Sequence, residues 1–310
     1  MLRLIKTAAV TLCLILWAAL GHAQAVTFTD ALGQAITVDN PQRVVTLMGS
    51  FAETWLLAGG GATLVGTAVD TTDTRDLGIP DHVVSVGTYQ SPNLEQILGL
   101  DPDLVILSGD TVRTGNHVAL RDSLAAAGIP AAYFKVTHFE DYLSMLDICT
   151  QITGDKQAYE HNGAAVQAQI EKILSEHAAQ DGPSVLLMIT YSGGIRPQGA
   201  DTMTGRMLDQ MGWRNILDDY PSLLRDFSIE KVIEIDPDYI LVIPMGNDEE
   251  ALRRNLEKSV ESNPAWKGLS AVVNDRYILL PGEKFVYKPN ARWAESYAHL
   301  AGLLRNAQMK

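Results

Sequence analysis

One arrangement of apolar and polar positions occurs twice in this chain. The first copy, NLEQILGLDPDLVIL, starts at Asn93, and the second, SIEKVIEIDPDYILV, starts 135 residues later at Ser228. Each copy opens with a residue that favours a helix N-cap and places a Glu in the first turn, where the helix dipole stabilises a carboxylate. Asp-Pro-Asp then ends the helix, because the residue before proline is disfavoured in the α region. The β-branched run that follows predicts a strand buried in a parallel sheet.

The rest of the chain follows the same alternation of short apolar runs and amphipathic runs. An antiparallel strand pair is expected around Leu32-Gly33, a polar loop over 191–199, and mainly parallel sheets in both halves. Strands are predicted over 43–48, 64–67, 83–86, 104–107, 131–136, 185–190 and 239–242, and the segment 277–280 is expected to lead into a loop over 281–289. The pattern predicts an α/β protein with two Rossmann-like lobes.

One long segment between the two halves has no strong turn signal. Residues 154–180 contain no turn signal apart from Gly163, which a helix can tolerate. They predict a helix of roughly 24 residues, about 36 Å long. This helix is expected to span from one lobe to the other. The predicted organisation is an N-terminal lobe over 26–153, an interlobe helix over 154–180 and a C-terminal lobe over 181–310.

The first 25 residues have the pattern of a secretory signal peptide. Arg3 and Lys6 precede an apolar run over 8–21, and Ala23-Gln24-Ala25 fits a small-residue cleavage site. The run is shorter than the ~20 residues that span a bilayer, and no Cys follows it for lipid attachment. We therefore expect cleavage after Ala25 and a soluble protein in the periplasm.

Charge and cysteine content exclude several classes of function. The chain carries a formal net charge of −13, which disfavours nucleic acid as a partner because phosphate binding needs clustered Lys and Arg. Cys149 is the one Cys that follows the leader, and its apolar helical surroundings predict a buried thiol without a disulfide. The six His residues after the leader show no metal-ligand spacing, so no intrinsic metal or cofactor is expected.

Together these features resemble the ABC-transporter periplasmic solute-binding proteins of the iron-siderophore, haem and cobalamin class. The resemblance covers about 27–305 and rests on 43–66 and on the segment from Asn93 to Ile106. It implies a monomer that binds a small-molecule metal chelate between its lobes, closes by small rocking and delivers the ligand to a membrane permease. It also implies that Glu95 and Glu230 pair with permease arginines, although helix dipoles alone would favour the same two residues.

Ligand contacts in such a fold are expected from loops after the carboxyl ends of strands. The cationic candidates stand out in an acidic chain and would suit an anionic iron chelate, although solvated surface charges are the alternative. The main candidates are Tyr89, Gln90, Tyr191, Arg196, Lys284, Tyr287 and Arg292. Further candidates from the same loops are Ser50, Phe51, Asp70, Thr71, Arg113, Gln198 and Lys288.

The sequence predicts a siderophore-like iron chelate as the transported ligand and leaves haem or cobalamin open. Some haem-binding relatives carry a ligating Tyr in the loop of Tyr89, but here Gln90 follows it instead of Met-Arg. Tyr287 and Trp293 could stack on a planar ligand, or they could simply pack in the core.

The sequence leaves two other classes of function open. Chelatases are similar two-lobed proteins that use a His and an acid in the cleft, and His138 with Glu140 is the one candidate pair. These two residues lie too close on one predicted helix start to be convincing, and no phosphate loop, Ser–His–Asp order or Cys pair is present. We therefore expect a binding protein without enzymatic activity, or a sensor module that reports ligand to a membrane receptor.

Overall fold

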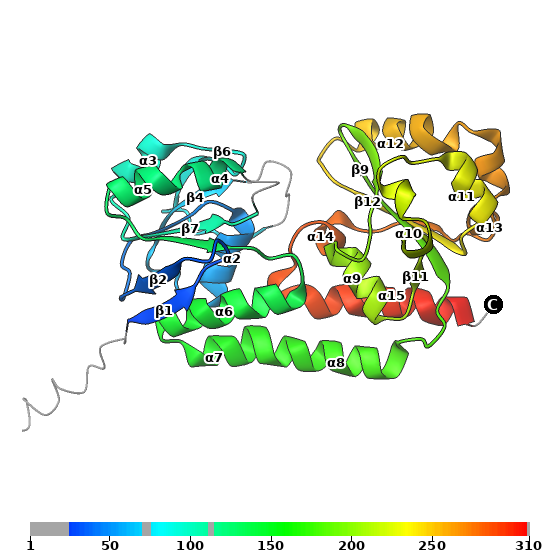
Figure 1. The fold of residues 1–310 in the computed structure, drawn as a ribbon. Coiled ribbons are helices and arrows are strands. Elements are labelled where there is room, and N and C mark those ends of the chain that lie inside the picture. Colours follow the sequence, from blue (N-terminus) through cyan, green and yellow to red (C-terminus); the bar gives the residue numbers. More distant parts are fainter. Residues whose placement is uncertain (1–24, 70–75, 111–114, 309–310) are drawn as a thin grey trace, which may run out of the picture.

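Two α/β lobes lie side by side in the computed structural model, and a layer of long helices runs along one side of both (Figure 1). The structure describes residues 25–69, 76–110 and 115–308. Most of the predicted leader lies outside these residues, as do the candidates Asp70, Thr71 and Arg113.

The N-terminal lobe is built on one six-stranded sheet with the order β6-β5-β4-β3-β7-β8. All neighbouring strands are parallel except β5 and β6. The strands are β3 Val44–Thr46, β4 Leu64–Val69, β5 Val84–Thr88, β6 Ser91–Pro92, β7 Leu104–Ser108 and β8 Ala131–Phe134. A separate antiparallel hairpin of β1 Val26–Thr29 and β2 Ala35–Val38 confirms the predicted strand pair.

The C-terminal lobe has a five-stranded sheet with the order β10-β9-β12-β13, and β11 also pairs with β9. The strands are β9 Ser184–Tyr191, β10 Gly194–Pro197, β11 Arg214–Asn215, β12 Tyr239–Pro244 and β13 Tyr277–Leu279. The prediction of a polar loop over 191–199 was wrong for β10, which turns back antiparallel onto β9. Gly194 permits this tight return because it has a φ of +128°.

Helices cover both sheets. In the N-terminal lobe these are α2 Gly49–Leu57, α3 Leu94–Gly99, α4 Gly115–Ala119, α5 Arg121–Ala126 and α6 Phe139–Thr153. In the C-terminal lobe they are α9 Met203–Gln210, α10 Ile216–Asp219, η2 Pro221–Leu224, α11 Ile229–Ile235, α12 Glu249–Leu256, η3 Glu257–Glu261, η4 Pro264–Gly268, α13 Ser270–Val273, α14 Gly282–Phe285, η5 Asn290–Arg292 and α15 Trp293–Gln308.

The repeated sequence unit forms the same structure in both lobes. The side chain of Asn93 accepts from the Gln96 amide at the start of α3, and Ser228 accepts from the Lys231 amide at the start of α11, both at 3.1 Å. Each Asp-Pro-Asp begins with a residue in the left-handed region, with φ of +46° at Asp101 and +49° at Asp236. These caps and turns confirm that the two units are equivalent.

The second carboxylate of each Asp-Pro-Asp ties the unit to the first strand of its sheet. Asp103 accepts from the Gln42 and Arg43 amides at 2.8 and 2.9 Å, just before β3. Asp238 accepts from the Ser184 amide at 2.9 Å and from its hydroxyl at 2.7 Å, at the start of β9. The sequence repeat therefore reflects a repeated tether as well as a repeated helix and strand.

The predicted interlobe helix is present but starts later than expected. Gly154, with a φ of +77°, ends α6, and Asp155 caps the next helix by accepting from the Ala158 amide at 3.0 Å. That helix runs through α7 Lys156–Tyr159, a π-helical turn η1 Glu160–Ala164 and α8 Ala165–His177. A Cβ at Gly163 would lie 3.2 Å from Leu146 of α6, so this glycine permits close packing.

The two lobes share one hydrophobic core along the helical layer. The same cluster of buried residues contains Leu104 of the first sheet, Ile170 of α8 and Leu241 of the second sheet. Figure 1 shows α8 beside α15, and these two helices pack on one another beneath the C-terminal lobe. Phe139 at the start of α6 packs edge to face on Trp293 at the start of α15, with ring centroids 5.8 Å apart. The lobes are therefore joined by packed side chains as well as by the chain itself.

Among the described residues, no helix combines the length and the hydropathy needed to cross a membrane.

Candidate functional site

A cleft lies between the lobes where the carboxyl ends of both sheets face one another. Its volume is about 400 Å³. The N-terminal lobe contributes residues that follow β3, β5, β7 and β8, and the C-terminal lobe contributes the β9–β10 hairpin, the start of α9, the end of β12 and the segment after α14. This is the position at which α/β sheets generally bind ligands, because the loops at the strand ends vary without disturbing the core.

The N-terminal wall of the cleft begins at the first turn of α2. Met48, Gly49, Ser50 and Phe51 line the cleft, and the Met48 side chain makes no cap hydrogen bond. The positive end of this helix therefore faces the cleft without a side-chain cap. Lys135, which follows β8 and is exposed, adds a full positive charge to the same wall.

Tyr89 reaches the cleft from the segment after β5 and is held from behind by α4. The His117 Nε2 lies 2.6 Å from the Tyr89 carbonyl oxygen, and the His117 Nδ1 accepts from the Ser108 amide at 3.1 Å. Asn116 also donates to the carbonyl oxygens of Tyr89 and Gln90. Burial lowers the pKa of His117, although the bond to the Tyr89 carbonyl partly opposes that effect.

The C-terminal wall is organised by the β9–β10 hairpin. The Arg196 guanidinium lies over the Tyr191 ring, 5.9 Å from its centroid, and Asn255 of α12 donates to the Tyr191 carbonyl at 2.6 Å. Gln198 is buried, and its side-chain amide donates to the Pro197 carbonyl at 3.0 Å. These contacts fix the strand that carries Arg196 to the cleft.

Tyr287 and Lys288 complete this wall. The Gly246 amide donates to the Tyr287 hydroxyl at 3.2 Å, which ties the segment after α14 to the end of β12. Among the described residues that line the cleft, the charged ones are Lys135, Arg196, Lys288 and Asp110. Cationic side chains from both lobes therefore face the same space.

The structure brings some of the predicted contact residues together and leaves others outside. The cleft is lined by Tyr89, Arg196 and Tyr287, and also by Ser50, Phe51, Gln198 and Lys288. The described residues that line it do not include Gln90, Tyr191, Lys284 or Arg292.

Each of these four residues has an identifiable position. Gln90 is exposed, and Tyr191 lies beneath the Arg196 guanidinium. Lys284 forms an ion pair with Glu295 at 3.5 Å, and Arg292 is exposed in η5. Trp293 is 1 % exposed and packs on Phe139, so it is not available to stack on a ligand.

Sequence reasoning missed Lys135 and Asp110. Lys135 lies inside the segment predicted as a strand over 131–136, and the strand ends one residue earlier, at Phe134. Asp110 follows β7, whose predicted end at residue 107 was one residue short of the observed end. The rule that strand ends supply ligand contacts would have identified Lys135 if the end of β8 had been placed correctly, and it already applied to the segment that holds Asp110.

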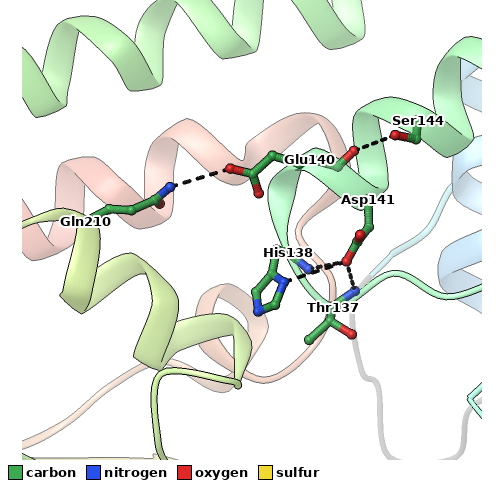
Figure 2. Close-up of polar contacts among 6 residues, drawn as sticks. All are labelled: Thr137, His138, Glu140, Asp141, Ser144 and Gln210. Carbon is green, nitrogen blue, oxygen red and sulfur yellow. Dashed lines mark hydrogen bonds and ion pairs between the residues drawn. The ribbon is translucent and has the colours of Figure 1, made fainter. Parts of the chain in front are cut away.

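Figure 2 shows that His138 and Glu140 do not form a catalytic pair. The Glu140 carboxylate points toward Gln210 of α9, which donates to it at 3.5 Å. The acidic residue that faces His138 is Asp141. Its carboxylate accepts from the backbone amides of Thr137 and His138, both at 2.8 Å, and lies 3.8 Å from the His138 Nδ1. Neither His138 nor Glu140 is among the residues lining the cleft.

Within the described residues, no group of three or more His, Cys, Asp or Glu side chains is arranged to hold a metal ion.

The two glutamates of the repeated unit are both exposed. Glu95 lies in the first turn of α3, and Glu230 lies in the first turn of α11, where the Ser228 hydroxyl donates to its carboxylate at 3.0 Å. In Figure 1, α3 and α11 lie on the side of the molecule opposite α7 and α8, one on each lobe.

The sequence and the fold are similar to those of known binding proteins. The family model described as periplasmic binding protein matches residues 44–283. A cobalamin-binding protein of Halobacterium salinarum is 30% identical over 290 residues, which cover 88% of this chain and 74% of that protein.

Two solved structures illustrate the likeness of fold. An ABC transporter substrate-binding protein from Listeria monocytogenes has a TM-score of 0.66 and 19% identity, over 86% of this chain and 99% of that one. The petrobactin-binding protein YclQ of Bacillus subtilis has a TM-score of 0.67 and 19% identity, over 93% and 99%. These similarities confirm the two-lobed α/β fold that the sequence predicted, and relatives of this kind bind and transport ligands rather than catalyse reactions. The chain therefore belongs to the periplasmic binding protein family, in the class of ABC-transporter substrate-binding proteins that its sequence resembled.

Proposed function

We propose that this protein captures an anionic, siderophore-like iron chelate between its lobes and delivers it to the permease of an ABC importer. The observation that carries the proposal is the charge of the cleft in an acidic protein. Lys135 enters from the N-terminal lobe, and Arg196 and Lys288 enter from the C-terminal lobe. A ligand bearing several negative charges would draw both walls toward it.

The cleft also has the other properties that a chelate site requires. Its volume of about 400 Å³ falls within the range of roughly 300–1,000 Å³ that is usual for small-molecule sites. Met48, Val286 and Tyr287, which are half-buried, provide apolar and aromatic surface for the organic part of a ligand. Arg196 can bind a carboxylate or catecholate in a bidentate manner, which Lys cannot do.

Fluorescence titration of the processed protein tests the ligand. Ferric tris-catecholate, ferric citrate, a ferric hydroxamate, hemin and cyanocobalamin would be added in turn, with quenching of Trp and Tyr emission as the signal. We expect an anionic ferric chelate to bind, and Arg196→Ala to weaken binding about tenfold or more, as loss of a charge-assisted contact should. Arg305→Ala is the matched control, because Arg305 is exposed near the end of α15.

Cobalamin is the second candidate, because the relative that is 30% identical is a cobalamin-binding protein. Cyanocobalamin has no net negative charge, so its binding should be insensitive to Arg196→Ala. Tight binding of cyanocobalamin with no response to ferric chelates would replace the chelate proposal with this one.

Haem gives a separate spectroscopic outcome. A tyrosinate is a suitable ligand for ferric haem, and Tyr89 lines the cleft. A Soret shift that Tyr89→Phe abolishes would identify a haem carrier, since this variant removes only the hydroxyl group.

Delivery to a permease is proposed from Glu95 and Glu230. Two exposed carboxylates on the same side of the molecule, one on each lobe, could meet two cationic patches of a membrane partner. Such exposed pairs contribute only ~0–1 kcal/mol each, so their role would be to fix register and raise the association rate. Uptake by cells should be lost in Glu95→Arg/Glu230→Arg and retained in the control Glu171→Arg/Glu176→Arg on α8. Unchanged uptake in the first variant would refute docking through these residues and favour a sensor role.

The periplasmic location is proposed from the leader. N-terminal sequencing of the exported protein should begin at Val26, and gel filtration at low micromolar concentration should give a monomer. A mature protein that keeps its leader in the membrane fraction would contradict both the cleavage and the soluble state.

A further inference from the structure

His117 lies behind the cleft and connects two segments that form its N-terminal wall. Its side chain is fully buried and is not among the residues lining the cleft. It contacts the Ser108 amide at the end of β7 and the Tyr89 carbonyl after β5. Strands β5 and β7 are separated by β4 and β3 in the sheet, so no backbone ladder joins these two strand ends directly. The imidazole therefore supplies a connection that the sheet does not.

The two partners determine which nitrogen carries the proton. The Ser108 amide can only donate, so Nδ1 must present its lone pair at 3.1 Å. The Tyr89 carbonyl can only accept, so Nε2 must carry the hydrogen across the 2.6 Å contact. Both bonds are satisfied at once only by the neutral imidazole with its proton on Nε2. An imidazolium would direct an N–H group at the Ser108 amide and would place a charge in a buried position.

We infer that His117 is a positioning residue, which as the neutral Nε2–H tautomer holds the Tyr89 segment and the end of β7 in place, and that its protonation releases this wall of the cleft. Ser108 and Tyr89 both line the cleft, so a loss of order there should lower ligand affinity without any direct contact between His117 and ligand. The consequence for affinity rests on the proposed function, whereas the positioning role does not.

The groups packed around His117 also bear on its protonation state. On β8, the Tyr133 hydroxyl donates to the His117 backbone carbonyl at 3.3 Å rather than to its ring. β6 consists of Ser91 and Pro92, and within the described part of the adjoining segments the charged residues are Asp110 after β7 and Arg121 and Asp122 on α5. Burial is the larger influence on the pKa of His117 and lowers it from 6.5. The neutral form is therefore present at neutral pH, and release is expected only below about pH 6.5.

Two substitutions separate the two hydrogen bonds. His117→Gln places an amide near the position of Nε2, so it can still donate to the Tyr89 carbonyl but does not titrate. In His117→Asn the shorter side chain reaches only the position of Nδ1. It can still accept from the Ser108 amide, but it cannot form the hydrogen bond to the Tyr89 carbonyl. His161→Gln is the matched control, because His161 is exposed in η1. A side chain that served only to fill space would give similar results in the first two variants.

The experiment uses the ligand-free protein first. Nitrogen-15 spectra of labelled histidine should show His117 protonated on Nε2 alone at about pH 7.5 and converting to imidazolium below about pH 6.5. Hydrogen-exchange protection factors for residues 84–92, corrected for the intrinsic effect of pH, should fall roughly tenfold over the same range. The fall should be absent in His117→Gln, present in His161→Gln, and replaced in His117→Asn by low protection at every pH.

Two outcomes would overturn the inference. A proton on Nδ1 of His117 at neutral pH would contradict the assigned bonds, and an unchanged acid-induced fall in His117→Gln would show that another group controls the segment. Titration with ferric tris-catecholate at both pH values then tests the effect on affinity, with an expected loss of roughly fivefold to tenfold at the lower pH in the wild type and in His161→Gln, but not in His117→Gln. If none of the probes binds, the proposed function fails, while the spectra and exchange data still decide the role of His117.

Discussion

Cys149 shows how burial controls the chemistry of a single side chain. It lies on α6, is fully buried, and burial raises the pKa of its thiol to about 12. Because the thiolate is the reactive form, the folded protein processed after Ala25 should not react with Ellman's reagent at about pH 8. One thiol per chain should react after unfolding in guanidinium, and none in unfolded Cys149→Ala. Rapid reaction of the folded protein would contradict the buried position.

His299 predicts a contribution to the pH dependence of stability. It packs edge to face on Phe285 with ring centroids 5.4 Å apart, and burial together with the nearby Lys284 lowers its pKa. The unfolded chain therefore binds a proton more readily than the folded one. The contribution of His299 to the free energy of unfolding is complete above pH 6.5 and is lost as the pH falls toward the lower folded pKa.

Urea unfolding between about pH 7.5 and about pH 5 measures this effect. His299→Gln should lose less stability on acidification than the wild type, whereas the control His82→Gln, at an exposed histidine, should behave like the wild type. Equal losses in His299→Gln and the wild type would show that the pKa of the His299 imidazole does not differ between the folded and unfolded states.

At the scale of elements, the tether at Asp238 should matter more than its equivalent at Asp103. Asp238 is half-buried and accepts two hydrogen bonds from Ser184 through one oxygen, whereas Asp103 is exposed and its partners can bond to water. We expect Asp238→Ala to lower the free energy of unfolding by about 1–3 kcal/mol. Asp103→Ala should cost less than that. Urea unfolding should also show that Asp238→Asn retains most of the stability, because an amide still offers one oxygen. A larger loss in Asp103→Ala would reverse this ranking.

Local signals explain which elements could be predicted from the sequence. The repeated unit was predicted in detail because its N-caps, Asp-Pro-Asp turns and β-branched runs are all properties of neighbouring residues. Strand β10 was missed because Ile195 and Pro197 form a strand only by pairing with β9, and that pairing is not encoded in the segment itself. The interlobe helix was predicted two residues too long at its start because Gly154 was read as part of the helix rather than as the end of α6.

The candidate site could be predicted only to the level of its loops. Tyr89 and Arg196 were nominated from strand ends and do line the cleft. Tyr191 was nominated by the same rule but lies beneath Arg196, and Lys284 is engaged by Glu295. Which side chain of a loop faces the cleft depends on pairing partners that are distant in the sequence, so composition alone could not separate them.

At the scale of the molecule, two features oppose free hinge motion. The lobes share a hydrophobic cluster through α6, α8 and α15, and polar contacts bridge them on either side of it. On one side, Glu140 of α6 accepts from Gln210 of α9 at 3.5 Å, and Gln210 in turn accepts from the Tyr297 hydroxyl of α15. On the other side, Asn290 joins η5 to α2. Ligand capture in this protein is therefore expected to involve a small rocking of the walls rather than a wide opening.

Asn290 provides the sharpest test of this interlobe connection. It is 1 % exposed with a φ of +50°, and its side-chain amide donates to the Ser50 carbonyl at 2.9 Å and to the Glu53 carboxylate at 2.6 Å. Asn290→Ala removes both bonds and introduces a residue that disfavours the left-handed backbone conformation found at this position. We therefore expect the free energy of unfolding, measured in urea, to fall by about 2–4 kcal/mol. Asn290→Gly removes the same bonds without the backbone cost and should lose about 1–2 kcal/mol less.

Asn290→Asp separates the two effects that the other variants combine. Aspartate tolerates the left-handed backbone nearly as well as asparagine, but its carboxylate would face two acceptors, the Ser50 carbonyl and the Glu53 carboxylate. We therefore expect Asn290→Asp to be destabilised at neutral pH and to recover as the pH falls toward about 4, where carboxyl groups take up protons. Small-angle scattering of the same variant should show a larger radius of gyration at neutral pH than at acid pH. Wild-type stability of Asn290→Asp at neutral pH would mean that the amide bonds do not hold the lobes together, and the shared helical core would then have to fix their angle alone.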